Sequence, residues 1–294
     1  MDIVKLTPPA KGYIWGGNRL RGYGVVSADA VIAEAWVLSF HKDGESRLAD
    51  GRALSAVATR ADWGTACNRF GDFPVLVKLI DAADDLSVQV HPSDAYASAH
   101  EGQPGKTEMW YVIDALPGAA LYVGFKRDVT RAAYERSIKT DTLLSLLNTY
   151  KVKKGDCYFI PAGTVHAIGK GCLIAEVQQS SNLTYRVFDY NRTGADGKPR
   201  ELHIQKALAV TTLTRYLPQR AAGAVLADCD YFTAALASGA VTVGRGDSFT
   251  GVLVTEGEGT LNGEAIRPGD SYFIPAGRRA DIKGGATVLL TYVK

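Results

Sequence analysis

The chain has 294 residues, with 33 Lys and Arg against 31 Asp and Glu, which gives a formal net charge of +2. That length supports one large domain or two smaller ones, each with a real hydrophobic core. The near-neutral balance argues against the basic surface of a dedicated nucleic-acid binder. No stretch approaches the roughly eighteen apolar residues of a membrane span. We therefore expect neither a nucleic-acid partner nor a membrane.

The N-terminal segment 1–15 has no basic stretch followed by an apolar run, so we expect no export signal and a cytoplasmic protein. Thiols in that compartment are ordinarily reduced and mostly buried. The chain has four cysteines, Cys67, Cys157, Cys172 and Cys229. None forms a C-x-x-C pair, which argues against a zinc ribbon.

Short apolar, β-branched and aromatic runs separated by glycine-rich turns predict a mostly β fold. In chain order, the clearest of these runs lie at 73–81, 86–90, 108–114, 119–125, 156–162 and 172–179. Helical spacing of apolar residues predicts a few helices, at 94–100, within 128–147 and at 201–210.

A nine-residue segment occurs twice. GDCYFIPAG at 155–163 returns as GDSYFIPAG at 269–277, an offset of 114 residues with eight of nine positions identical. Two copies at a long period indicate a duplicated domain rather than a solenoid. A glycine turn, a short apolar strand and a Pro-x-Gly turn are typical of an antiparallel jelly roll. We predict two domains, residues 1–216 and a smaller copy at 217–294.

The two copies differ at one position that bears on chemistry. His166 follows the first copy, and its counterpart after the second is Ala280. Gln89 and His91 alternate along an apolar strand, so their side chains share a face, and Glu108 begins a later strand. Two imidazoles, a carboxylate and an amide oxygen suit a borderline divalent metal such as zinc. Only the first copy is therefore predicted to hold a metal.

These motifs resemble a known family. Gly155-x5-Pro161-x-Gly163-x2-His166 resembles the second motif of the cupin superfamily. LSVQVHP at 86–92, KTE at 106–108 and the segment 175–192 resemble type I mannose-6-phosphate isomerases, specifically the short bacterial form. The resemblance covers nearly the whole chain. It implies duplicated cupin-type jelly-roll barrels with a few short helices.

The resemblance also implies an activity, the interconversion of mannose 6-phosphate and fructose 6-phosphate with one Zn²⁺ per chain. Carried onto this chain, it implies the zinc ligands Gln89, His91, Glu108 and His166, the catalytic Arg186, and the pocket residues Lys78, Ser87, Lys106 and Glu176. Lys78 and Ser87 are candidates for contacting the phosphate. Proton transfer through a cis-enediol needs a base, and either Glu176 or Lys106 qualifies. A sugar phosphate is the expected partner, and the chain is expected to be a monomer or a weak homodimer.

Other interpretations stay open. A different metal-dependent cupin enzyme, such as an iron or manganese dioxygenase, would favour a more histidine-rich site than Gln89 and Glu108 provide. A non-catalytic sugar-phosphate-binding cupin would need neither a base nor Arg186. Some residues also have ordinary structural alternatives, because Arg186 could pair with Asp189 and Lys78 could point outward to water.

Overall fold

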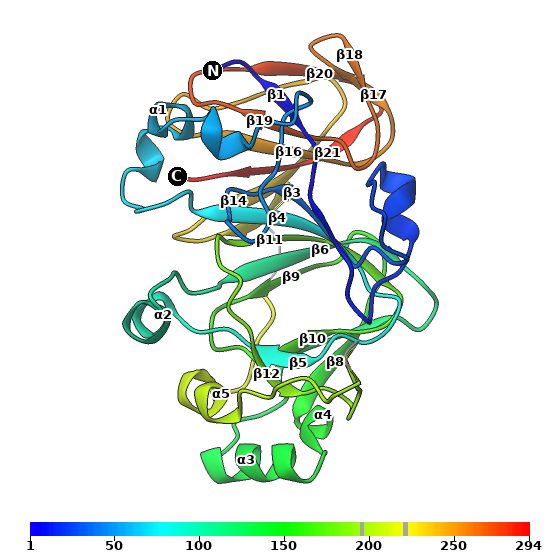
Figure 1. The fold of residues 1–294 in the computed structure, drawn as a ribbon, viewed down its shortest axis with the longest axis vertical. Coiled ribbons are helices and arrows are strands. Elements are labelled where there is room, and N and C mark those ends of the chain that lie inside the picture. Colours follow the sequence, from blue (N-terminus) through cyan, green and yellow to red (C-terminus); the bar gives the residue numbers. More distant parts are fainter. Residues whose placement is uncertain (195–196, 220–222) are drawn as a thin grey trace.

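The structure is a computed structural model that describes residues 1–194, 197–219 and 223–294. It is built mainly from antiparallel strands, so the mostly β prediction is confirmed (Figure 1). In the described part of the chain, the strands form four sheets, which we number I to IV in the order in which they stack. Sheets III and IV come mostly from the first two thirds of the sequence, and sheets I and II mostly from its end.

Sheets III and IV face each other and form the first jelly roll. In spatial order, sheet III contains β2 (Ala10–Lys11), β3 (Glu34–Leu38), β4 (Val75–Asp81), β11 (Cys172–Gln179), β6 (Glu108–Ala115) and β9 (Cys157–Ile160). Sheet IV contains β12 (Tyr185–Phe188), β5 (Val88–Val90), β10 (His166–Ile168), β7 (Ala120–Phe125) and β8 (Leu147–Lys151).

Sheets I and II form the second jelly roll. Sheet I contains β15 (Val241–Val243), β20 (Ala280–Gly284), β17 (Gly259–Leu261) and β18 (Glu264–Ile266). Sheet II contains β1 (Val4–Leu6), β19 (Ser271–Ile274), β16 (Thr250–Glu256), β21 (Thr287–Tyr292), β14 (Thr233–Ser238) and β13 (Val225–Asp228). The N-terminal strand β1 therefore pairs with a strand of the second copy, through contacts such as Val4 with Phe273.

The repeated segments occupy matching places. The first copy contributes β9 and then β10, and the second contributes β19 and then β20. His166 is the first residue of β10, and Ala280 is the first residue of β20. Both side chains are buried. The structure therefore places His166 and Ala280 at equivalent positions of two otherwise similar strand arrangements.

The helices lie mainly outside the sheets. They are α1 (Arg60–Trp63), α2 (Asp94–Glu101), α3 (Arg131–Lys139), α4 (Leu143–Leu146) and α5 (Ile204–Val210), with 3₁₀ turns at Arg19–Tyr23, Leu54–Ala56 and Thr65–Cys67. Helices α3, α4 and α5 gather at the end of the molecule beyond sheet IV (Figure 1). The helical segment predicted within 128–147 is split, because Asp141 adopts a left-handed φ of 55° between α3 and α4. Among the helices described, none is long and apolar enough to span a membrane.

Alternation along the central strands of sheet III separates an apolar face from a polar one. Val77 and Leu79 of β4 point toward sheet II, where they join a core with residues such as Phe273. The intervening Lys78 must then point toward sheet IV. Its side chain is only 6% exposed, so the alternative in which it reaches water is wrong. The same alternation turns Glu176 of β11 into the space between sheets III and IV.

Candidate metal centre and substrate cavity

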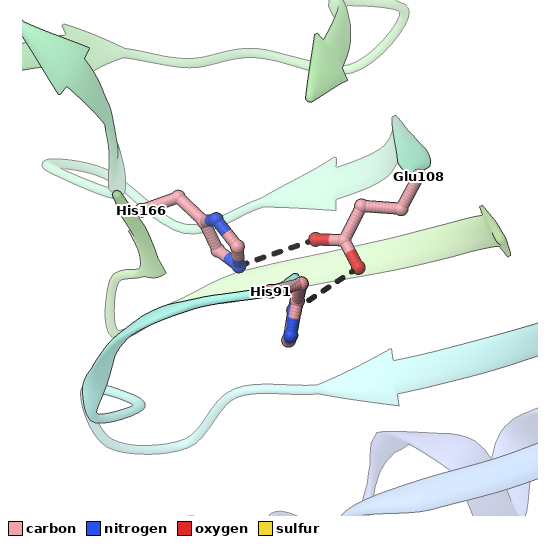
Figure 2. A group of neighbouring side chains, drawn as sticks. All are labelled: His91, Glu108 and His166. Carbon is pink, nitrogen blue, oxygen red and sulfur yellow. Dashed lines mark ion pairs between the residues drawn. The ribbon is translucent and has the colours of Figure 1, made fainter. Parts of the chain in front are cut away.

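Three buried side chains converge between sheets III and IV. His91 directly follows β5, Glu108 begins β6 and His166 begins β10. The Nε2 atoms of His91 and His166 lie 3.4 and 3.3 Å from the two carboxylate oxygens of Glu108. Figure 2 shows both imidazoles directed at this carboxylate. One ligand atom from each residue fits within 4.8 Å of the others, as a metal site requires.

Hydrogen bonds to backbone carbonyls determine which ring nitrogen of each imidazole carries the hydrogen. The Nδ1 atom of His91 lies 2.7 Å from the carbonyl oxygen of Leu183, and that of His166 lies 2.8 Å from the carbonyl oxygen of Thr164. A carbonyl only accepts, so each Nδ1 carries the hydrogen and each Nε2 presents its lone pair. Burial and the nearby Lys106 lower the pKa of His91 well below its usual range and that of His166 to about 3. Both rings are therefore neutral ligands at neutral pH.

The surroundings of Glu108 indicate whether a metal ion fits between the three side chains. Its side chain is completely buried, and burial and then Glu176 raise its pKa to about 7. One carboxylate oxygen, Oε2, contacts the ammonium of Lys106. The other, Oε1, is buried with no hydrogen-bond partner among the described residues. An unsatisfied buried carboxylate oxygen is costly, and a cation coordinated by this oxygen and the two Nε2 atoms would relieve that cost.

Gln89 stands beside the triad. It pairs with His166 across the β5–β10 ladder, and its amide Nε2 lies 3.4 Å from the Nε2 of His166. The oxygen and nitrogen of an amide exchange places by a half-turn. Gln89 can therefore offer an oxygen to the same ion.

The triad adjoins a cavity of about 320 Å³. Its lining includes the remaining predicted residues together with other polar groups: Tyr13, Trp15, Glu34, Lys78, Ile80, Leu86, Ser87, Gln89, Lys106, Ile168, Glu176, Asn182, Thr184, Arg186 and Arg200. The structure thus brings all nine sequence-predicted site residues into one region between sheets III and IV. What each of them does in a reaction stays a prediction.

Charged groups form a network on the sheet III wall of the cavity. The ammonium of Lys78 lies 3.6 Å from Glu34 and 3.5 Å from Glu176, and that of Lys106 lies 3.8 Å from Glu176. Burial opposes the charge on Lys78, but Glu34 and Glu176 outweigh it and hold its pKa above the usual value. Burial likewise opposes the charge on Glu176, but Lys106 and Lys78 outweigh it and lower its pKa. Glu176 is therefore an ionised carboxylate at neutral pH.

Trp110 completes the surroundings of Glu176. It lies opposite Glu176 in the β6–β11 ladder, and its indole Nε1 donates to Oε2 of Glu176 at 2.8 Å. That bond leaves Oε1 of Glu176 for the two lysines. The carboxylate is therefore held in one orientation within the cavity wall.

Arginines define the sheet IV side. Arg186 of β12 donates from Nε to the hydroxyl of Ser87 at 3.1 Å and from one terminal nitrogen to the carbonyl of Glu201 at 3.0 Å. Asp189 pairs instead with Arg192 and Arg200. The sequence alternative in which Arg186 pairs with Asp189 is therefore wrong.

Sequence reasoning missed some of the lining residues. Glu34 and Trp36 share a face of β3 by strand alternation, and Trp36 donates to Glu34 at 2.7 Å. That period-two pattern could have placed Glu34 in the cavity. Arg200 comes from the irregular segment before α5, where no periodic signal exists.

The fold and the site together define a jelly-roll protein with a candidate metal centre beside a polar cavity. Residues 3–110 match the family model described as phosphomannose isomerase type I, catalytic domain. The chain is 37% identical to mannose-6-phosphate isomerase ManA of Bacillus subtilis, over 92% of each sequence. It is 38% identical to mannose-6-phosphate isomerase of Streptococcus mutans, over 89% of each.

A solved structure agrees with these sequence relationships. The crystal structure of the mannose 6-phosphate isomerase from Bacillus subtilis superposes with a TM-score of 0.90 over all of both chains, at 32% identity. The chain belongs to the type I phosphomannose isomerase family. The predicted family is thereby confirmed.

Proposed function

We propose that this chain interconverts mannose 6-phosphate and fructose 6-phosphate with the help of one zinc ion. The observation that carries the proposal is the buried His91, Glu108 and His166 triad, which adjoins a polar cavity in a chain of this family. Two neutral imidazoles, a carboxylate and an adjacent amide form a donor set that suits zinc and leaves room for substrate oxygens. When bound, the zinc ion would act as a Lewis acid on the sugar oxygens.

Isomerisation moves a proton between C1 and C2 of the open-chain sugar through a cis-enediol. Glu176 and Lys106 are the candidates for carrying that proton. The surroundings favour Glu176 as the acceptor, because its carboxylate is ionised and oriented by Trp110. The ammonium of Lys106, 3.8 Å from Glu176, then helps to hold that carboxylate in its charged form.

The remaining predicted residues bind and orient the substrate. Arg186 lines the cavity and carries a fixed positive charge, which stabilises negative charge that develops on the sugar oxygens. Lys78 and Ser87 line the same cavity and are proposed to contact the substrate. Walls on two facing sheets keep these groups in fixed positions, which lowers the entropic cost of reaching a reactive geometry.

A coupled assay in both directions tests the function. The purified chain should convert each sugar phosphate into the other, lose activity when zinc is removed by a chelator, and regain it with about one equivalent of zinc. Mass spectrometry of the metal distinguishes zinc from the iron or manganese of other cupin enzymes. A folded, zinc-replete preparation that is inactive in both directions would contradict the proposal.

Arg186 separates the enzyme from a binding-only cupin. Arg186→Ala should lower kcat by about 10²–10³-fold, the usual effect of removing a group that stabilises charge in the transition state. Zinc content and the unfolding midpoint should stay near those of the parent. If the parent binds the sugar phosphate without turning it over, the binding-only interpretation is correct instead.

A further inference from the structure

We propose that Arg200, which lies beside Arg186, binds the phosphate group of the substrate together with the hydroxyl of Ser87, and that Asp189 positions Arg200 for this task. The inference rests on the proposed function and names a residue that the sequence patterns did not indicate. Its basis is the placement and charge of the segment that precedes α5.

That segment is attached directly to β12. The backbone N–H of His203 donates to the carbonyl of Arg186 at 2.7 Å, and the Arg186 side chain donates to the carbonyl of Glu201 at 3.0 Å. Arg200, the next residue back along the chain, is therefore held near Arg186. Both guanidinium groups line the same end of the cavity, where Ser87 also lies.

The charges at this end are unbalanced. Asp189 is shared by Arg192 and Arg200, and Arg192 also reaches the half-exposed Asp84 at 3.3 Å. Within the described ranges, Arg186 has no carboxylate within ion-pair distance. Burial and the neighbouring Arg200 lower its pKa. Three arginines thus share two carboxylates, which leaves a positive excess that an anion would neutralise.

The opposite wall of the cavity has the reverse balance. There the ammonium groups of Lys78 and Lys106 are shared among three carboxylates, those of Glu34, Glu108 and Glu176. A sugar phosphate is close to a dianion at neutral pH, so these carboxylates would repel it. The charge distribution therefore directs the phosphate toward Arg200 and leaves the sugar between Arg186 and the triad.

Asp189 controls how Arg200 is presented. It accepts from both Nε and Nη2 of Arg200, and its side chain is only 5% exposed. This two-pronged contact fixes the guanidinium plane and leaves Nη1 facing away from the carboxylate. A planar donor group held in this way suits a phosphate oxygen better than a mobile lysine would.

Arg200→Met tests the inference in the zinc-loaded protein. Calorimetric titration with inorganic phosphate should show binding weakened by about tenfold or more, since charge-assisted hydrogen bonds are lost. The KM for mannose 6-phosphate should rise by a similar factor, with a smaller change in kcat. Zinc content should not change, because Arg200 contacts none of the triad. Arg245→Met is the matched control, since it removes a half-buried arginine outside the cavity that also pairs with an aspartate, Asp247.

The outcomes separate this inference from the proposed function. If Arg200→Met leaves both phosphate affinity and KM unchanged in an active parent, the inference is overturned while the isomerase stands. If the parent is inactive but its phosphate affinity still depends on Arg200, the anion site stands and the isomerase fails. Arg200→Lys serves as a second variant, expected to restore part of the phosphate affinity by keeping the charge.

Discussion

Asp189 shows how one carboxylate can organise several cations. It lies almost buried between Arg192 and Arg200. Burial opposes its charge, but the hydrogen bonds from the two arginines outweigh this and lower its pKa. A lowered pKa means that the ionised carboxylate is more stable in the folded protein than in the unfolded chain, so its charge contributes to the free energy of unfolding.

Asp189→Asn should therefore destabilise the protein in a pH-dependent way. At pH values above the ordinary carboxyl pKa of 3.8, the substitution should lower the free energy of unfolding by about 1.5–3 kcal/mol, as expected for the loss of charge-assisted hydrogen bonds. The difference from the parent should shrink as the pH falls through the lowered folded pKa, because the parent aspartate is then protonated too. Urea unfolding at several pH values measures this.

Asp50→Asn is the control for that experiment. Asp50 forms an exposed pair with Arg52, and exposed pairs contribute little to stability because water screens them. If the stability difference between Asp189→Asn and the parent stayed constant down to the lowest pH, the charge of the carboxylate would not be the cause of the destabilisation.

At the scale of elements, the turn after β9 holds the triad in place. Gly163 has a φ of +87°, and its N–H donates to the carbonyl of His91 at 2.8 Å. A side chain there would be strained, and its Cβ would approach the hydroxyl of Thr212 to 2.6 Å. This turn therefore links the segment that carries His166 to the one that carries His91.

Gly163→Ala should lower both stability and metal affinity. The left-handed backbone costs about 1–2 kcal/mol for alanine, and displacing the turn from Thr212 would also disturb His91. Zinc competition with a chromophoric chelator should show weaker binding, and thermal unfolding should show a lower midpoint.

The repeat supplies a matched control, Gly277→Ala. Gly277 has a φ of +80° at the equivalent turn, and a Cβ added there would meet no described atom within 4 Å. The strand that follows this turn begins with Ala280 in place of a histidine. The variant should lose stability while keeping the zinc affinity of the parent. Equal zinc affinity in the Gly163 and Gly277 variants would contradict the proposed link between the turn and the metal site.

At the scale of the whole molecule, the two jelly rolls share a core. Side chains of sheet III, such as Val77 and Met109, pack in the same cluster as Leu253, Phe273 and Leu289 of sheet II. Strand β1 also extends from the beginning of the chain to pair with β19. The division at 216/217 stays a prediction, and these contacts join the two parts closely.

We expect a single calorimetric unfolding transition for the full chain, because separating the jelly rolls would expose a large shared apolar surface. A chain ending at residue 216 should be poorly soluble for the same reason. Two well-separated transitions, or a soluble and folded 1–216 fragment, would show instead that the first domain is stable on its own.

Particular residues show what the sequence could predict. Strand alternation put Gln89 and His91 on one face, and the repeat singled out His166 by contrast with Ala280. Both inferences depend on regular spacings, the two-residue alternation of a strand and the 114-residue repeat, that can be read from the sequence alone. The same alternation put Lys78 on the face opposite Val77 and Leu79, but whether that face met water or a second sheet depended on packing between segments far apart in the chain.

The sequence by itself determined the β architecture, the duplicated frame, the family and the residues that meet at the candidate metal centre. The tertiary structure decided the partners of the charged groups. Asp189 pairs with Arg200 rather than Arg186, and Glu34 reaches Lys78, because these contacts join separate strands and irregular segments. Electrostatic pairing depends on distance and burial in three dimensions, which no local pattern of residues encodes.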